Sequence, residues 1–200
     1  MTESKNIVTP AGQLVYPYLK SPDVKFDDDG VWKTQLRLKG AEAENLKALI
    51  DKEVDEAVSE FSEKKNKKVK RGNAPYKIEE DVSTLFNFKL KASGVRPDGS
   101  KWTQKPVLYD SKGNLINGAI HVWGGSTGKV AFLPVRYHTS LIGASVSLRM
   151  KAVQILNLVE GGEGASASSY GFSTEESGYE TSNDTATVEA VANEKQVEDF

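Results

Sequence analysis

The sequence predicts a mainly β domain that contains one amphipathic helix and is followed by a disordered acidic tail. Three patterns support this prediction: hydrophobic and polar residues alternate in several segments, hydrophobic residues recur every three or four positions in one segment, and branched apolar residues become rare after residue 160. We therefore expect a domain over residues 1–160 and a tail over residues 161–200. About 160 residues are enough for one well-buried core.

The first strands are predicted from proline, turn and alternation signals. Residues 12–19 (GQLVYPYL) predict a strand in which Pro17 marks an edge or a bulge, because proline cannot donate to a ladder. The DDDG sequence at residues 27–30 indicates a turn, since Asp and Gly tolerate turn backbone angles. From residue 31 to 39 the polarity alternates as in a half-buried strand. Trp32, Thr34, Leu36 and Leu38 fall on one face, and Lys33, Gln35, Arg37 and Lys39 on the other.

One segment follows the helical period instead. Between residues 41 and 63, hydrophobic residues recur at spacings of three and four, which predicts an amphipathic helix. The basic sequence that follows, up to Lys77, contains Gly72 and Pro75 and is interpreted as a loop. Its run from Lys64 to Arg71 has two open interpretations: a helix end favoured by the helix dipole, or a flexible arm that contacts phosphates.

Strand patterns return after this loop. From residue 85 onward, Phe86, Phe88 and Leu90 alternate with polar residues that include Lys89 and Lys91. A long loop or hairpin tip follows over residues 94–105. Further strands are expected over residues 105–109, 115–123, 129–137 and 141–158, with a change of phase near Ala152 and Val153 that suggests a bulge.

The order of elements favours a small antiparallel barrel over a parallel α/β sheet, because one helix interrupts a series of strands. The oligonucleotide/oligosaccharide-binding (OB) fold is the best match in size, although its usual helix comes later in the strand order. Periodicity alone does not separate this fold from other small barrels.

Few patterns in the chain suggest catalysis or metal binding. The two histidines, His121 and His138, have no carboxylate at metal-ligand spacing beside them. Residues 124–129 (GGSTGK) lack both the first glycine and the final Ser or Thr of a phosphate-binding loop, so we expect a β-turn. Residues 27–29 are expected to form a solvated turn. There is no cysteine for a disulfide, a thiol nucleophile or a thiolate site. We therefore expect no enzyme, no cofactor and no metal.

The start of the chain is polar, and no apolar run approaches the roughly 20 residues of a membrane span. We expect neither a signal peptide nor membrane association.

Basic residues interleaved with aromatic ones give the positive signal. If the strands join in one sheet, their basic faces merge into a stripe that attracts phosphates, and exposed rings beside it can stack on the bases of single strands. Trp102 is the best stacking candidate, because it lies in a polar loop among basic residues; anchoring of that loop is the open alternative. The predicted DNA-binding residues are Lys33, Arg37, Lys39, Lys89, Lys91, Arg96, Lys101, Trp102, Lys105, Tyr109, Arg149 and Lys151.

Charge is divided sharply along the chain. Residues 160–200 contain ten acidic residues and a single lysine, a net charge of −9, whereas residues 1–159 carry +7. Such a division is typical of a body that binds polyanions and an acidic interaction tail. The tail ends in Glu198, Asp199 and the aromatic Phe200, which we predict to bind a partner.

In these features the chain resembles phage-encoded single-stranded DNA-binding proteins. The resemblance spans the whole length and rests on the β-rich basic body, the aromatic and basic faces, and the Glu198–Asp199–Phe200 ending. Asp199 stands directly before Phe200, as in podovirus proteins, where bacterial counterparts have proline. The resemblance implies an OB-fold that coats single strands during replication and recombination in the cytoplasm of an infected bacterium. It also implies a tail that recruits replication proteins and competes with DNA.

Three other functions remain open at this stage. A protein that anneals complementary strands would use the same surface, usually as a homo-oligomeric ring or filament. A metal-dependent nuclease would use residues 27–29 with other acids. A structural phage protein would use the charge division only for solubility.

Overall fold

The structure is a computed structural model that describes residues 6–117 and 120–159. The predicted tail over residues 161–200, including Glu198, Asp199 and Phe200, lies outside the described residues, as does the boundary at residue 160. In chain order the elements are β1 (Ile7–Val8), β2 (Gly12–Asp23), β3 (Val31–Leu38), α1 (Gly40–Lys65), β4 (Tyr76–Ile78), β5 (Thr84–Lys91), β6 (Ser93–Val95), β7 (Lys101–Thr103), β8 (Val107–Tyr109), β9 (Thr127–Thr139) and β10 (Gly143–Asn157).

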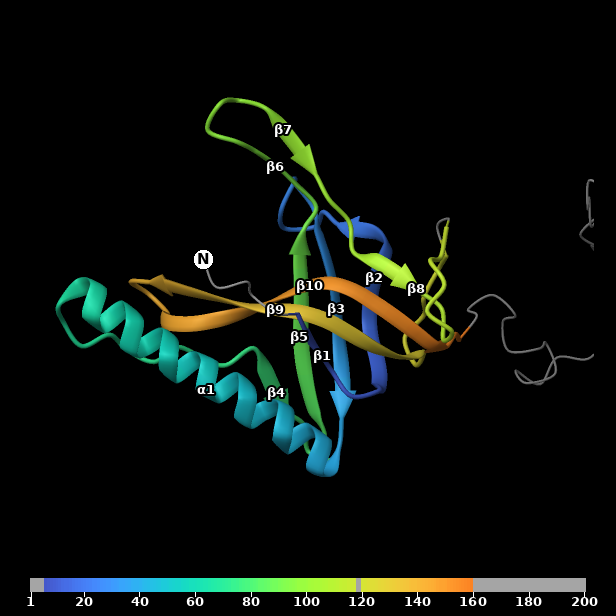
Figure 1. The fold of residues 1–200 in the computed structure, drawn as a ribbon, viewed down its shortest axis with the longest axis horizontal. Coiled ribbons are helices and arrows are strands. Elements are labelled where there is room, and N and C mark those ends of the chain that lie inside the picture. Colours follow the sequence, from blue (N-terminus) through green and yellow to red (C-terminus); the bar gives the residue numbers. More distant parts are fainter. Residues whose placement is uncertain (1–5, 118–119, 160–200) are drawn as a thin grey trace, which may run out of the picture. The chain divides into compact units, whose positions relative to one another are not determined.

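Five of these strands close into a barrel (Figure 1). The order around the ring is β2, β3, β5, β10 and β9, and β9 returns to pair with β2. All ring neighbours are antiparallel except β5 and β10, which run parallel. The prediction of a mainly β, OB-fold-like domain with one helix is therefore confirmed.

The core is built from the predicted alternation. In β3, Leu36 and Leu38 are buried together with Thr34, whereas the residues between them are partly exposed. In β5, Phe86 and Phe88 are buried, and the ring of Phe88 meets that of Phe132 on β9 with centroids 5.2 Å apart. Every second side chain of these strands thus points into the barrel, and the polar side chains between them lie on its outer face.

Both predicted bulges are present. In β2, Val15 pairs with Gln35 but Tyr18 pairs with Lys33, so β2 has one residue more than β3 between these pairs. Tyr16 at this bulge has a positive φ of 47°, which is rare for a residue with a side chain. In β10 the register shifts between Met150 and Ala152.

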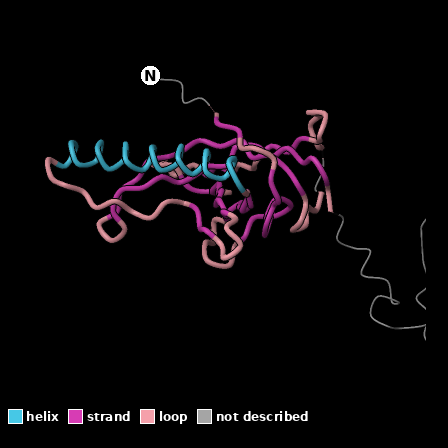
Figure 2. The backbone as a smooth tube through the Cα atoms, turned by 90° about the horizontal axis from the view of Figure 1, so that it is seen from below, coloured by secondary structure: helices cyan, strands magenta, loops and turns pink. Residues whose placement is uncertain are grey.

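In the sequence, the helix lies between β3 and β5. Its apolar stripe packs on β9 and β10, and Figure 2 shows the helix running along one side of the strands. The helix ends at Asn66, whose left-handed φ of 49° turns the chain. The buried residues of the stripe are Ala43, Leu46, Ile50, Val54 and Ala57.

The prediction of a strand over residues 115–123 is wrong. The described residues of this segment, 115–117 and 120–123, form no strand. Only an isolated bridge joins Leu115 to Tyr109. The carboxylate of Asp110 accepts hydrogen bonds from the backbone and the side chain of Asn114, which folds the chain into a turn. Beyond it, Val122 is buried, and the carbonyl of Trp123 accepts a turn hydrogen bond from the Ser126 N–H, with no strand assigned at residues 120–123.

No helix within residues 6–117 and 120–159 combines the length and the apolar character needed to cross a membrane.

Candidate nucleic-acid interface

Three of the predicted DNA-binding side chains lie in one row with a tyrosine, across four strands. Lys33 on β3 is in register with Lys89 on β5, and Lys89 is in register with Arg149 on β10. On the other side of Lys33, its partner on β2 is Tyr18. We call Tyr18, Lys33, Lys89 and Arg149 the central row.

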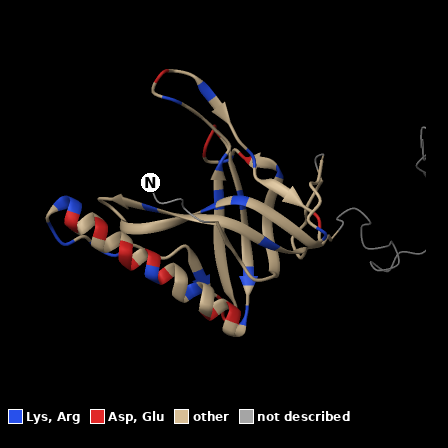
Figure 3. Cartoon of the chain, in the orientation of Figure 1, with Lys and Arg blue, Asp and Glu red and all other residues tan. Residues whose placement is uncertain are grey.

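The central row lies on the outer face of the barrel. Lys89 and Arg149 are exposed between buried neighbours, and 41% of the Tyr18 surface is accessible. Residues directly opposite on neighbouring antiparallel strands have Cβ atoms about 4.5–5.5 Å apart, so the side chains of Tyr18, Lys33 and Lys89 begin side by side. Figure 3 shows basic positions on β3, β5 and β10, whereas acidic positions gather on α1 and in loops.

Two shallow grooves run along this row. One, of about 340 Å³, is lined by Tyr16, Tyr18, Lys33 and Lys89 among others. The other, of about 260 Å³, is lined by Lys89, Lys91 and Arg149 among others, and by one carboxylate, that of Asp27. Lys89 lines both grooves, so the surface is continuous from β2 to β10.

Four predicted DNA-binding cations are already paired with carboxylates. Lys33 bonds to Asp23 and also lies over the Tyr18 ring, with its Nζ 4.7 Å from the ring centroid. The hydrogen bond from Lys33 holds the pKa of Asp23 below its usual value. The other three pairs are Arg37 with Glu79 at 2.7 Å, Lys39 with Asp81 at 2.7 Å and Lys91 with Asp29 at 2.8 Å.

The basic residues of the row on β5 and β10, and Lys151 beside them on β10, have no such carboxylate partner in the part of the chain that the structure describes. Among the described residues, no carboxylate lies within 4.0 Å of Lys89, Arg149 or Lys151. An incoming anion can therefore meet these three charges without displacing a protein carboxylate.

Arg37 and Lys39 share the face of Lys33 but not its row. Arg37 is four residues, or about 13 Å, further along β3. Its guanidinium bonds to Glu79 and to Gln13, and the hydrogen bonds from Arg37 and then Ser83 lower the pKa of Glu79. These contacts hold the C-terminal end of β3 in place.

The predicted loop candidates belong to a hairpin outside the central row. β6 and β7 form an antiparallel hairpin that begins two residues after Lys91 and projects from the barrel (Figure 1). Trp102 lies over its cross-strand neighbour Gly94, where an added Cβ would be 2.7 Å from the indole ring. Trp102 is thus half-buried against the hairpin itself. Arg96, Lys101 and Lys105 are exposed around it, and Tyr109 is half-buried on β8.

The run from Lys64 to Arg71 is held mainly by the helix. Lys64 pairs with Glu60, and Arg71 pairs with Asp51 and Asp55. Val69 is buried, and its N–H donates to the hydroxyl of Ser62.

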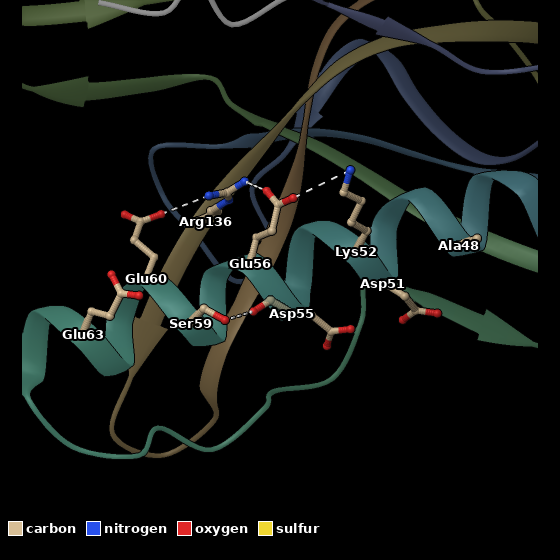
Figure 4. A pocket seen from close by; sticks show the side chains of 9 residues that line it. All are labelled: Ala48, Asp51, Lys52, Asp55, Glu56, Ser59, Glu60, Glu63 and Arg136. Carbon is tan, nitrogen blue, oxygen red and sulfur yellow. Dashed lines mark hydrogen bonds and ion pairs between the residues drawn. The ribbon is translucent and has the colours of Figure 1, made fainter.

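A larger groove, of about 820 Å³, lies on the exposed face of α1 and has the wrong sign for phosphate (Figure 4). Arg136 on β9 reaches into it and bonds to Glu53, Glu56 and Glu60. Burial lowers the pKa of Arg136, but the hydrogen bonds to Glu53 and Glu60 outweigh it and the net shift is upward. Further carboxylates line the groove, so the cluster ties the helix to the barrel and repels anions.

The predicted turn at residues 27–30 is confirmed. The Asp29 N–H donates to the Asp27 carboxylate at 3.1 Å, and Gly30 has a positive φ of 75°. Asp29 is engaged by Lys91, and within the described residues no three potential metal ligands converge.

Sequence reasoning missed one aromatic group. The rings of His121 and Trp123 stack with centroids 4.0 Å apart and an interplanar angle of 8°, beside Tyr16 and Tyr18. Trp123 was not a candidate because its segment was predicted as a strand. The signal available in the sequence is the order His121–Val122–Trp123, in which two ring side chains flank one apolar residue.

Both the sequence and the fold match those of known proteins. Residues 11–158 match the family model described as single-stranded DNA-binding protein, bacteriophage T7. A solved structure of gp2.5, a single-stranded DNA-binding protein of bacteriophage T7, is 28% identical and superposes with a TM-score of 0.71, covering 89% of this chain and 99% of that one.

A more distant solved structure has the same fold. The single-stranded DNA-binding protein of bacteriophage Enc34, solved in complex with ssDNA, is 14% identical with a TM-score of 0.56, covering 79% of this chain and 89% of that one. No curated protein sequence matches this chain.

Proposed function

The chain belongs to the bacteriophage T7 single-stranded DNA-binding protein family, and from this premise we propose that it coats single-stranded DNA without regard to sequence. The DNA would run along the central row, with its phosphates on Lys89 and Arg149 and its bases beside the aromatic rings of β2. The observation that carries the proposal is the register that joins Lys33, Lys89 and Arg149 across three strands.

The position of the row in the barrel supports this choice of face. β3 and β5 are the second and third of the five ring strands, and the corresponding strands of OB-folds present the surface that binds oligonucleotides. A row of cations contacts the backbone of any sequence, and stacking tolerates every base because each has a π-face. Neither contact reads hydrogen-bonding edges, so we expect little sequence preference.

The ion pairs of Lys33 and Lys91 lead to a second expectation. Lys33 and Lys91 reach a phosphate only if Asp23 and Asp29 release them, so they contribute less than Lys89 and Arg149. The Lys91–Asp29 pair is exposed, and exposed ion pairs are worth only about 0–1 kcal/mol, so its exchange is accessible at ordinary salt. Asp23 is only 14% exposed, so Lys33 is released less readily.

A competition experiment tests the proposal. Unlabelled single-stranded DNA, duplex DNA and single-stranded RNA of equal length displace labelled oligo-dT from the full chain at two salt concentrations. We expect single-stranded DNA to compete best and all competition to weaken at the higher salt. Equal competition by duplex DNA would contradict single-strand binding, and absence of oligo-dT binding would overturn the proposal.

We also propose two roles for the acidic tail, on the strength of its charge. With a net charge of −9, residues 160–200 would act as a phosphate mimic that competes for the basic body. Deleting residues 161–200 should then tighten oligo-dT binding, most at low salt. Unchanged or weaker affinity in the deletion would count against competition.

The second role is recruitment, in which Phe200 with Glu198 and Asp199 would bind replication or recombination proteins. Phe200→Ala should reduce capture of those partners and leave oligo-dT binding unchanged. A loss of both together would refute separate roles.

The wider setting is part of the same proposal. The protein would protect single strands during phage replication and recombination in the host cytoplasm, by binding alone and without catalysis. Incubation of single-stranded DNA with the protein and magnesium should leave the strand intact. Sizing with and without DNA would reveal a homo-oligomer, and an annealing assay would show whether coated complementary strands also pair.

A further inference from the structure

We propose that the groove between the β2 bulge and the loop before β9 holds an unpaired nucleobase, stacked against the Trp123–His121 ring pair. This inference rests on the proposed function, because the base belongs to the same bound strand. The groove has a volume of about 500 Å³, and we call it the aromatic groove. Its lining includes Tyr16, Pro17, Tyr18, Lys20, His121 and Trp123.

The groove presents unusually exposed rings. Tyr16 is 73% exposed and Trp123 is 41% exposed, although large aromatic side chains are mostly covered in folded domains. The indole and the imidazole stack face to face, with centroids 4.0 Å apart, so each ring keeps one flat outer face. A group of exposed rings around a hollow marks an interaction site, and flat rings suit a flat aromatic partner.

The backbone that carries these rings is fixed. Val122, between the two stacked residues, is only 2% exposed and anchors the loop in the core. The loop is also bonded to β2: the Gly125 N–H donates to the Leu14 carbonyl at 2.9 Å, and the Leu14 N–H donates to the Ser126 carbonyl at 2.7 Å. Rings held this way lose little conformational freedom when a ligand stacks on them.

The opposite wall of the groove carries backbone strain. Tyr16 has a φ of 47°, and this conformation at the bulge directs its side chain outward. Strained positions of this kind are concentrated at sites that bind ligands. The bulge displaces Tyr16 from the regular ladder and places it beside Tyr18 at the edge of the hollow.

The aromatic groove continues the central row. Tyr16 and Tyr18 line both this groove and the one that contains Lys33 and Lys89. A strand whose phosphates follow the row therefore reaches the rings without a break, and Lys20 supplies a further cation there. Because the approach to the groove is cationic, a polyanion with flat aromatic groups fits better than a peptide.

The size of the hollow agrees with this occupant. Sites for small organic groups enclose about 300–1,000 Å³, and the aromatic groove falls in this range. No hydrogen-bonding edge need be read there, so the contact would not select one base.

The experiment compares full-length variants for oligo-dT affinity and tryptophan emission. Trp123→Leu removes the ring, Trp123→Phe keeps a smaller one, and Phe26→Leu is the matched control, because Phe26 is 88% exposed and does not line the groove. We expect Trp123→Leu to weaken binding about 5- to 150-fold, with Trp123→Phe in between and Phe26→Leu unchanged. The salt slope should stay the same in all of them, since no charge is altered.

Emission gives a readout that does not depend on the stability of the leucine variant. DNA should quench the wild-type emission, and a clear part of this quenching should be missing in Trp123→Phe. Equal affinity of wild type, Trp123→Leu and Trp123→Phe, with full quenching retained in Trp123→Phe, would overturn the subsite while leaving the proposed function intact. That result would mean that the ring pair only covers its loop. If the wild type itself fails to bind oligo-dT, the proposed function fails and the subsite with it.

Discussion

Arg149 on β10 lies in register with Lys89 on β5, so two basic side chains separated by 60 positions in the sequence stand side by side on the outer face of the barrel. Parallel pairing of these two strands is what brings them together. Lys33 extends the line through the antiparallel pairing of β3 with β5. The basic surface is thus a product of barrel closure.

Asp23 reduces the positive charge that Lys33 contributes to this surface. Its carboxylate binds Lys33, and both belong to the face where we place the phosphates. Asp23→Asn removes a negative charge and releases Lys33, so oligo-dT affinity should rise about two- to five-fold. The logarithmic salt slope should steepen by up to about 0.7, since one more phosphate is neutralised.

The control for this change is Glu44→Gln. Glu44 pairs with Lys47 on α1 and is 63% exposed, so this change removes the same charge away from the row. If both variants tighten binding equally, the effect is one of net charge and not of Lys33.

Arg136 should contribute to stability and not to DNA binding. Arg136→Leu leaves Glu53, Glu56 and Glu60 facing one another without their shared cation. The side chain is 31% exposed, so we expect a loss of about 1–3 kcal/mol in the free energy of unfolding, smaller than for a fully buried pair. Urea denaturation measures this loss.

Lys52→Ala is the matched control on the same groove. Lys52 is 77% exposed and lies 3.9 Å from Glu56, so its removal should change stability by no more than about 0.5 kcal/mol. Equal stability of wild type and Arg136→Leu would show that the cluster is only a surface arrangement.

Tyr76 should make the protein sensitive to alkali. Burial, together with the hydrogen bond that its hydroxyl donates to Asp51, raises the pKa of Tyr76 from 10.0 to about 12. The folded state then holds the phenol proton where the unfolded state loses it, so this contribution is full below pH 10 and is lost as the pH rises toward 12.

Denaturant melts at several pH values between 9 and 12 would measure this effect. In Tyr76→Phe, stability should fall less steeply with pH over that interval than in the wild type. Parallel curves for the two proteins would contradict the raised pKa.

Local patterns predicted most of the elements. Alternation in β3 and β5 and the helical spacing in α1 depend on burying one face, and each of these segments does so in the structure. Pro17 indicated the β2 bulge for a physical reason that needs no tertiary information, since it has no N–H to give to the ladder.

Tertiary pairing could not be predicted in the same way. Arg37 meets Glu79, 42 residues away, and Lys39 meets Asp81, so counting charges along one strand overestimated the charge that is available to a ligand. The polar neighbours of Trp102 in the sequence do not predict its packing on Gly94 across the hairpin, and its role as a stacking residue stays a prediction. Trp123 was missed because alternation in residues 115–123 was interpreted as a strand.

The salt dependence of oligo-dT binding to wild type and to the double variant Lys89→Ala/Arg149→Ala tests the central claim most directly. If about five phosphates are neutralised, the wild-type slope of log affinity against log salt should be near −3.5, and the double variant should be shallower by about 1.4. Lys52→Ala, on the acidic face, should keep the wild-type slope. An unchanged slope in the double variant would show that the DNA lies elsewhere and would contradict the central row as the binding surface.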